Sequence, residues 1–194
     1  MKKYVFLLAA FATNVAFTQS WTRNYDFTDD NINGLAKVEK SKKIGFVDEK
    51  GKVVVPLIYD EAFRFSEGMA AVSTGGKWGY IDIRGAVIIP LQYYEAYSFS
   101  EGLAKVGKSD RFGFIDTAGK EIIGMKYTLA GKFSNGLAPV CNERSLWGYV
   151  DKNGNQVIGF KYGYAEAFND DGNGRVNKGG KWMMIDTAGK ETSE

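Results

Sequence analysis

The sequence predicts an all-β protein made of five tandem β-hairpin repeats of about 34 residues, stacked as an open, solenoid-like array. Three observations predict this fold class: a short apolar motif returns every 34 to 36 residues, a ring–Gly–ring core follows three of its five copies, and glycine is abundant while proline is scarce. The 194 residues include 24 Gly and 3 Pro, a balance typical of short strands joined by tight turns.

The first segment has the features of a secretory signal peptide. Lys2 and Lys3 form a basic start, and the mainly apolar stretch 4–17 is shorter than the roughly 20 residues that cross a membrane. Small residues at Ala16 and Thr18 predict cleavage before Gln19. We therefore expect residues 1–18 to be removed and the mature chain to be secreted or held in the cell envelope, in the periplasm or at the cell surface. The alternative is a buried first strand.

The repeats begin with a glycine followed by alternating apolar residues. Gly34-Leu35-Ala36-Lys37-Val38 returns at 68–72, 102–106 and 136–140, and in degraded form at 172–176. Self-similarity at a fixed period indicates a repeat architecture. The predicted organisation is an N-terminal cap at 19–33, a five-repeat array over 34–190 and a tail at 191–194. The individual repeats are 34–67, 68–101, 102–135, 136–171 and 172–190.

Each repeat then contains a hairpin. In the second copy Trp78-Gly79-Tyr80-Ile81-Asp82 is followed by a turn and the apolar run 86–89. The Asp can accept a backbone hydrogen bond from two residues on, and Gly85, three residues after it, tolerates positive φ. Gly79 leaves room for a neighbouring strand or a ring to approach closely. Ala70 and Val72 indicate a further short strand before the hairpin.

The end of the repeat is predicted to be irregular. Pro56 and Pro90 should end their strands, because proline cannot donate to a ladder. Tyr59, Ala62 and Phe65 are spaced by three, which fits a short 3₁₀ turn or an irregular corner whose rings fill the space between hairpins. One unit cannot bury both faces, so stability depends on stacked neighbours.

Two architectures fit this pattern. An open hairpin solenoid needs two or three strands per repeat, whereas a small five-bladed propeller needs four, usually within about 40–45 residues. The shorter period favours the solenoid.

The repeat core resembles that of the WG-repeat family. The resemblance rests on Lys77-Trp78-Gly79-Tyr80-Ile81-Asp82, the following Asp-x-x-Gly turn and the Phe-Ser-Glu-Gly-Leu-Ala junction at 99–104. It covers residues 34–190; Ile44 and Phe112 stand in place of Trp, and Met183 in place of Gly. The resemblance implies no common enzymatic activity, and it implies extracellular or scaffold-attached binding and structural modules.

The residue inventory argues against catalysis. The chain has no His and one Cys, which excludes His-based nucleophile systems and His or thiolate metal sites. Glu61, Glu95 and Glu166 fall near equivalent corners, and such repetition favours structural capping over catalysis. Two stretches open like calcium loops, at 29–34 and 169–174, but Lys40 and Gly180 stand where such a loop requires Glu. We therefore assign no catalytic, cofactor-binding or metal-ligating residue and expect no cofactor and no enzyme activity.

Charge and composition leave binding as the expected function. Residues 19–194 balance 23 acidic with 23 basic residues, without the basic excess of a nucleic-acid binder. The leading hypothesis is a secreted, non-enzymatic module that binds a protein or acts as a scaffold, without spanning the membrane. The alternative is a cell-wall or glycan-binding module that uses exposed Trp and Tyr rings. Residues that vary between copies are candidates for contacts: Tyr94, Tyr97, Arg64, Arg111 and Arg144.

Overall fold

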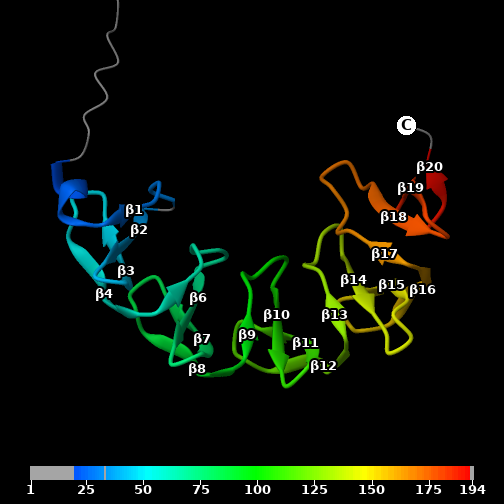
Figure 1. Ribbon diagram of the computed structural model, residues 1–194, viewed down its shortest axis with the longest axis horizontal. Coiled ribbons are helices and arrows are strands. Elements are labelled where there is room, and N and C mark those ends of the chain that lie inside the picture. The colour runs from blue at the N-terminus through cyan, green and yellow to red at the C-terminus, as the bar shows by residue number, and fades with distance from the viewer. Residues whose placement is uncertain (1–19, 33, 193–194) are drawn as a thin grey trace, which may run out of the picture.

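The protein forms five four-stranded antiparallel sheets arranged along an arc. The structure is a computed structural model, and it describes residues 20–32 and 34–192. The first and last sheets lie apart at the two ends of the arc (Figure 1). An open all-β array is therefore confirmed, and the closed five-bladed propeller is not formed. The predicted signal peptide, residues 1–18, lies outside the described residues.

The sheets share one strand order, in which sequential strands are neighbours. A 3₁₀ helix, η1 (Ser20–Asn24), precedes them. The strands are β1 (Phe27–Thr28), β2 (Leu35–Lys40), β3 (Lys43–Asp48), β4 (Val53–Tyr59); β5 (Glu61–Ala62), β6 (Met69–Thr74), β7 (Lys77–Asp82), β8 (Val87–Tyr93); β9 (Glu95–Ala96), β10 (Leu103–Lys108), β11 (Arg111–Asp116), β12 (Glu121–Tyr127); β13 (Leu129–Ala130), β14 (Leu137–Cys141), β15 (Trp147–Asp151), β16 (Gln156–Tyr162); β17 (Tyr164–Ala165), β18 (Gly174–Lys178), β19 (Lys181–Ile185) and β20 (Glu191–Thr192).

Each sheet has four strands, so the expectation of two or three per repeat is wrong. The additional strand is only two residues long and comes from the end of the preceding sequence repeat. Glu61 and Ala62, for example, form β5 and pair with Ser73 and Val72 of the next repeat. The corner at Tyr59, Ala62 and Phe65 is therefore a short strand flanked by buried rings, and not a 3₁₀ turn.

The two prolines lie inside β4 and β8, so the prediction that they end strands is wrong. Tyr80 pairs with Ile89 and Trp78 with Tyr93, so three residues of β8 bulge opposite the single residue Gly79. Pro90 belongs to this bulge, on the last strand of its sheet, where a missing N–H costs no ladder bond. A Cβ on Gly79 would lie 2.5 Å from the carbonyl oxygen of Ile89, so the close approach predicted for this glycine is confirmed.

The Asp-x-x-Gly turns have the predicted hydrogen bonds. Asp82 Oδ1 accepts the backbone N–H groups of Arg84 and Ala86 at 2.9 Å each. Gly85 has a φ of 83° and donates its N–H to the Asp82 carbonyl at 2.9 Å. The same side-chain bond, from the residue two positions on, occurs at Asp48, Asp116, Asp151 and Asp186. The turn geometry was therefore readable from the sequence.

The core lies between successive sheets. Phe46, Val55 and Phe65 of the first junction pack on Val72 and Ile81 of the second sheet. Each of the four junctions contains a ring pair in close contact, with centroids 4.7–4.9 Å apart: Phe46–Phe65, Tyr80–Phe99, Phe114–Phe133 and Tyr149–Phe168. Neighbouring sheets therefore pack on one another through these aromatic rings.

The two end sheets are finished differently. In the first sheet Trp21 of η1 lies against Gly51, so a Cβ on Gly51 would lie 2.6 Å from the Trp21 Cβ. In the second sheet the equivalent Gly85 lies against Val55 of the preceding sheet. In the fifth sheet β20 pairs with only two residues of β19. Its outer face carries the polar residues Arg175 and Asn177, where the fourth sheet has buried Pro139 and Cys141.

Candidate functional site

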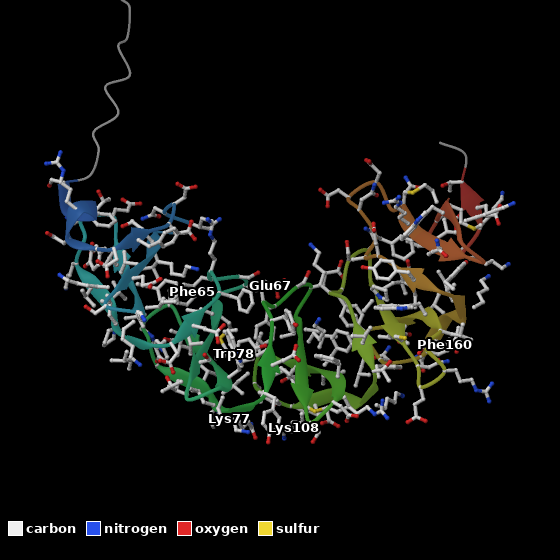
Figure 2. All side chains as sticks on the ribbon, in the orientation of Figure 1. Phe65, Glu67, Lys77, Trp78, Lys108 and Phe160 are labelled. Carbon is white, nitrogen blue, oxygen red and sulfur yellow. The ribbon has the colours of Figure 1, made fainter. Side chains whose placement is uncertain are left out.

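A hollow lies at the junction of the second and third sheets, where Trp78 is half-buried between them (Figure 2). The register of β5, β6 and β7 places Glu61 opposite Ser73 and Ser73 opposite Trp78. Directly opposed residues of antiparallel strands point to the same face. The second sheet therefore presents Glu61, Ser73 and Trp78 as one row on the face turned to the third sheet.

Six residues from the two sheets line this cavity, which has a volume of about 230 Å³: Glu61, Phe63, Trp78, Glu95, Ala96 and Tyr97. The Phe63 ring centroid lies 5.4 Å from that of Trp78 and 6.0 Å from that of Tyr97. Phe63 is 38% exposed, so the rings form an open wall. Such a wall can hold an aliphatic chain, a flat ring or an organic cation.

The polar groups of the cavity are mainly carboxylates. Tyr97 donates its hydroxyl to Glu95 Oε2 at 2.7 Å, and burial together with this bond raises the pKa of Tyr97 to about 12. The Glu61 carboxylate has no hydrogen bond or ion pair within the described residues. Behind Tyr97, Lys105 Nζ lies 3.6 Å from the ring centroid, and burial lowers the pKa of Lys105. The cavity itself is thus acidic.

Ser73 adds an unsatisfied group to the same face. Its side chain is fully buried, and its hydroxyl has no hydrogen-bond partner in the described part of the chain. Buried polar groups usually have a partner, so each exception calls for an explanation. Ser73 belongs to the row that contains Glu61 and Trp78, both of which line the cavity.

A second group of rings lies between the fourth and fifth sheets. The Tyr164 ring centroid is 5.3 Å from that of Trp147 and 5.8 Å from that of Trp182. The Arg175 guanidinium lies 4.3 Å from the Trp182 ring centroid and 3.9 Å from Glu166 Oε1. Trp182 and Tyr164 are 48% and 45% exposed, whereas Trp147 is buried. Two of the three rings therefore face solvent.

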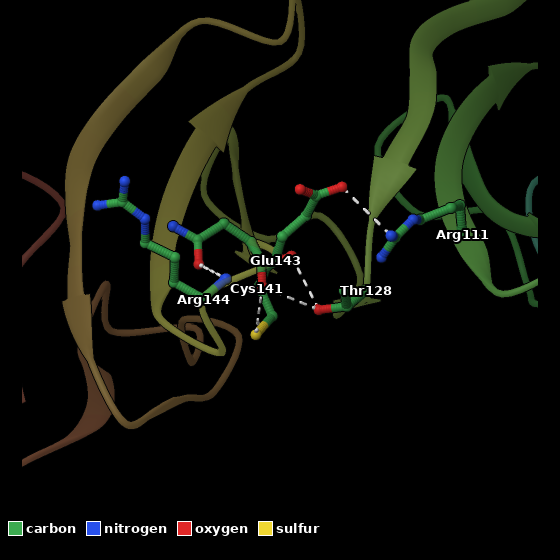
Figure 3. Close-up of polar contacts among 6 residues, drawn as sticks. Arg111, Thr128, Cys141, Glu143 and Arg144 are labelled. Atoms are coloured by element: carbon green, nitrogen blue, oxygen red, sulfur yellow. Dashed lines mark hydrogen bonds and ion pairs between the residues drawn. The ribbon is translucent and has the colours of Figure 1, made fainter.

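The third and fourth sheets are also joined by polar contacts (Figure 3). Arg111 forms an ion pair with Glu143 at 3.2 Å. Thr128, which extends the β13–β14 pairing of the fourth sheet, donates Oγ1 to the carbonyls of Cys141 and Asn142, at 3.3 and 3.2 Å. These residues surround the turn between β14 and β15, and the nearby hollow of about 420 Å³ is lined by charged and ring side chains, among them Lys126, Glu143 and Phe160.

The structure brings one of the five variable candidates into the cavity, namely Tyr97. Tyr94 is exposed, with Lys77 Nζ 3.4 Å from its ring centroid. Arg64 pairs with Asp29 of the first sheet, and Arg111 with Glu143. Arg144 contributes a backbone N–H to Asn142 Oδ1. These four residues do not converge on one site.

Sequence reasoning missed Phe63. The equivalent position in the second to fifth sheets holds Phe63, Tyr97, Gly131 and Glu166. This variation between copies is the signal that could have singled out Phe63. Glu61 and Glu95, expected only as recurring corner groups, lie together in the cavity. The two calcium-like stretches contain Asp29, paired with Arg64, and Asn169, whose Oδ1 accepts the N–H groups of Asp171 and Asn173. In residues 20–32 and 34–192, no three His, Cys, Asp or Glu side chains are grouped to hold a metal.

Comparison with known proteins identifies the repeat. The family model described as WG containing repeat matches residues 44–78, 78–111, 112–143 and 147–182. No curated protein matches the chain. Similar solved structures include the propeller-like BamB from Moraxella catarrhalis (TM-score 0.51, 16% identity, covering 84% of this chain and 58% of that one). Another is the computationally designed Ika8 protein (TM-score 0.54, 14% identity, covering 84% and 58%).

The same fold is found in Hsv2 from Kluyveromyces lactis, which is also propeller-like (TM-score 0.55, 11% identity, covering 82% of this chain and 59% of that one). At these identities the likeness shows the fold alone. The chain spans about 58% of the length of the solved structures it matches.

Proposed function

This chain belongs to the WG containing repeat family, and from that premise we propose that it is a secreted, non-enzymatic module that binds a protein or serves as a scaffold. The observation that carries the proposal is the ring-lined cavity between the second and third sheets, which lies on an extended repeat surface. Stacked repeats offer long surfaces for partners, and buried rings beside polar groups are typical anchors of protein interfaces.

The chemistry of the chain supports a role without catalysis. It contains no histidine, and its cavity carboxylates, Glu61 and Glu95, occupy the same position in two successive sheets. Secretion rests on the basic and apolar start of the sequence at residues 1–18. No helix among residues 20–32 and 34–192 is long and apolar enough to cross a membrane.

The proposal is tested by affinity capture with matched surface variants. Immobilised wild-type chain should retain a protein from an envelope extract, and the double variant Phe63→Ser/Tyr164→Ser should lose it. Both rings are exposed, at 38% and 45%, so the fold should tolerate the change. Ile58→Ser/Val87→Ser is the control, because these side chains are also exposed but lie on β4 and β8. Equal retention by the ring variant, or none by wild type, contradicts the proposal.

Glycan binding is a second candidate, favoured by the exposed rings of Tyr164 and Trp182. Rings of this kind can stack on the apolar faces of sugars. Affinity electrophoresis in gels that contain soluble cell-wall polysaccharide should show retardation of the wild-type chain and its loss in Trp182→Ala. Unretarded migration of wild type in every polysaccharide counts against this candidate.

A further inference from the structure

The odd-numbered sheets carry a cation at one equivalent position of their second strand. Lys37 lies opposite Phe46, Lys105 opposite Phe114, and Arg175 opposite Met184. The even-numbered sheets have uncharged residues there, Ala71 opposite Tyr80 and Pro139 opposite Tyr149. The chain therefore supplies its own cation at this position in alternate sheets.

The two lysines reach the next sheet in the same way. Lys105 Nζ lies 3.6 Å from the Tyr97 ring centroid and 5.1 Å from that of Phe112, and it donates to the carbonyl of Ala130 at 2.8 Å. Lys37 Nζ donates to the carbonyl of Ala62 at 3.3 Å. Ala62 and Ala130 both end the two-residue first strand of the following sheet. Both lysines thus bond to an alanine carbonyl. At Lys105 two ring faces complete a place for an ammonium group, whereas Lys37 Nζ lies 6.0 Å from the Phe27 ring centroid.

In the second sheet, the same place is the ring-lined cavity. Phe63 corresponds to Tyr97, because their N–H groups bond to the carbonyls of Ala71 and Lys105 respectively. Trp78 corresponds to Phe112, and Ala96 to Ala130. Phe63, Trp78 and Ala96 all line the cavity. Ala71 is too short to fill it, and no side chain of the described residues donates to the Ala96 carbonyl.

The charges around the cavity complement a cation. The Glu61 carboxylate is unpaired within the described residues, whereas the Glu95 carboxylate accepts the Tyr97 hydroxyl and interacts electrostatically with Lys105. The buried Ser73 hydroxyl, which has no partner, lies on the same face. In the fourth sheet the equivalent place is closed, since a Cβ on Gly131 would lie 2.6 Å from Pro139 Cγ and Trp147 is buried.

We propose that the cavity of the second sheet binds the ammonium group of a lysine side chain from a protein partner, in the place that Lys37 and Lys105 occupy in their own sheets. The lysine stem lies along Phe63 and Trp78, and its ammonium donates to the Ala96 carbonyl beside Glu61 and Glu95. This inference rests on the proposed protein-binding function and names the chemistry of the contact.

The first test uses n-butylammonium as the probe on the full chain. Its binding should shift the indole N–H resonance of Trp78 in a saturable way, and neutral 1-pentanol should bind about tenfold more weakly, because cation–ring and carboxylate contacts require the charge. Ala71→Lys places an internal ammonium in the cavity and should weaken butylammonium binding about tenfold or more. Retained amide protection in β6 and β7 checks that the second sheet of this variant is folded.

Two further variants keep the proposal testable if Ala71→Lys does not fold. Glu61→Gln/Glu95→Gln preserves the shape of the cavity and should weaken binding about tenfold. Lys105→Ala empties the equivalent place in the third sheet, so it should create a second butylammonium site that shifts the resonances of Tyr97 and Phe112. Butylguanidinium tests whether a lysine or an arginine is the better occupant, and tighter binding of the guanidinium overturns the assignment to lysine.

Several results overturn the inference. Equal affinity for butylammonium and pentanol removes the role of charge, and shifts at Trp182 instead of Trp78 place binding elsewhere. Tighter binding of a chito- or cello-oligosaccharide at Trp78 assigns the cavity to sugar. Retention of a protein partner by wild type and by Ala71→Lys alike leaves the protein-binding role and overturns only this inference. Butylammonium binding without any captured partner supports the cation site and overturns the protein-binding role.

Discussion

At the scale of single residues, the glycine of the ring–Gly–ring core is determined by the backbone of the next strand. The bulge around Pro90 passes directly over Gly79, and the bulge of β16 passes over Gly148. Met183 takes this position in the fifth sheet, where the described part of β20 pairs with Met184 and Ile185. The glycine is therefore needed where the fourth strand bulges over it.

Gly148→Ala should destabilise the protein by about 1–3 kcal/mol, because its Cβ would lie 2.6 Å from the Ile158 carbonyl oxygen. Gly159→Ala in the adjacent strand is the matched control. Its Cβ would meet only the end of Gln156 at 3.8 Å, so its effect should stay within about 0.5 kcal/mol. Urea unfolding measures both, and equal effects would contradict the close-approach explanation.

The turn residue Asp82 predicts a loss of stability in acid. Hydrogen bonds from the Arg84 side chain and from backbone N–H groups hold the pKa of Asp82 below its ordinary value of 3.8. A carboxyl whose pKa is lower in the folded state contributes stability above its unfolded pKa and loses it as the pH falls through the folded pKa. Asp82→Asn keeps an acceptor oxygen but no charge.

The urea midpoint of Asp82→Asn should therefore fall less steeply than that of wild type as the pH drops below about 3.8. The measurement is the midpoint across an acid pH series for both proteins. Thr117→Ala, at an exposed turn position with no side-chain bond, is the control and should keep the wild-type slope. Parallel curves for wild type and Asp82→Asn would refute the assigned pKa shift.

At the scale of elements, the sequence predicted the parts that have a repeating chemistry. The turn residues predicted the hairpin around Asp82. The spacing of Tyr59 and Phe65 predicted that their rings fill the space between neighbouring hairpins. The two-residue strands were not predictable, because two residues show no alternation and their partners lie in the next repeat. The prediction that Pro56 ends its strand was wrong for a similar reason, because the hydropathy pattern does not show a bulge on an end strand.

The cavity was beyond sequence reasoning for a related cause. It exists because Ala71 is small where Lys37 and Lys105 are long, and an alanine in an apolar motif indicates a core residue. Tyr97 could be singled out because it varies between copies. Its meeting with Phe63 and Trp78 depends on the four-strand register and on the approach of the next sheet.

Phe99→Ala tests the junction between sheets. Phe99 is buried, with its ring centroid 4.9 Å from that of Tyr80, so its truncation should cost about 3–5 kcal/mol. Hydrogen exchange should show lost protection in both the second and third sheets. Tyr94→Ala removes an exposed ring from the same corner and should cost about 0.5 kcal/mol or less. Loss of protection confined to one sheet would argue against a shared core.

At the scale of the whole molecule, stability depends on contacts between neighbouring sheets. The first and last sheets each have one neighbour, and different residues cover their outer faces. Trp21 covers the first sheet at the place where every later sheet meets a Val or Ile of its predecessor. The outer face of the fifth sheet carries the polar residues Arg175 and Asn177, beside the half-exposed ring of Trp182. Terminal repeats with a polar outer face keep such arrays soluble.

Trp21→Ala should loosen the first sheet and leave the centre intact. Amide exchange in β2 and β3 should accelerate, while β10 and β11 keep their protection, because in a linear array each sheet depends mainly on its neighbours. Trp182→Ala, which removes a 48% exposed ring at the other end, is the control and should leave β2 and β3 unchanged. Uniform acceleration over all five sheets would contradict this local dependence.

Each of the first four sequence repeats has, near its end, a two-residue strand that belongs to the next sheet. This arrangement affects how such a protein can change its number of repeats in evolution. Every junction is joined by the same pairing, as β5 with β6 and β9 with β10 show. A tandem duplication or deletion of one full 34-residue period, wherever its breakpoints fall, restores a complete sheet at each seam. Unequal crossing-over between copies can thus lengthen or shorten the arc without a new linker or a new fold.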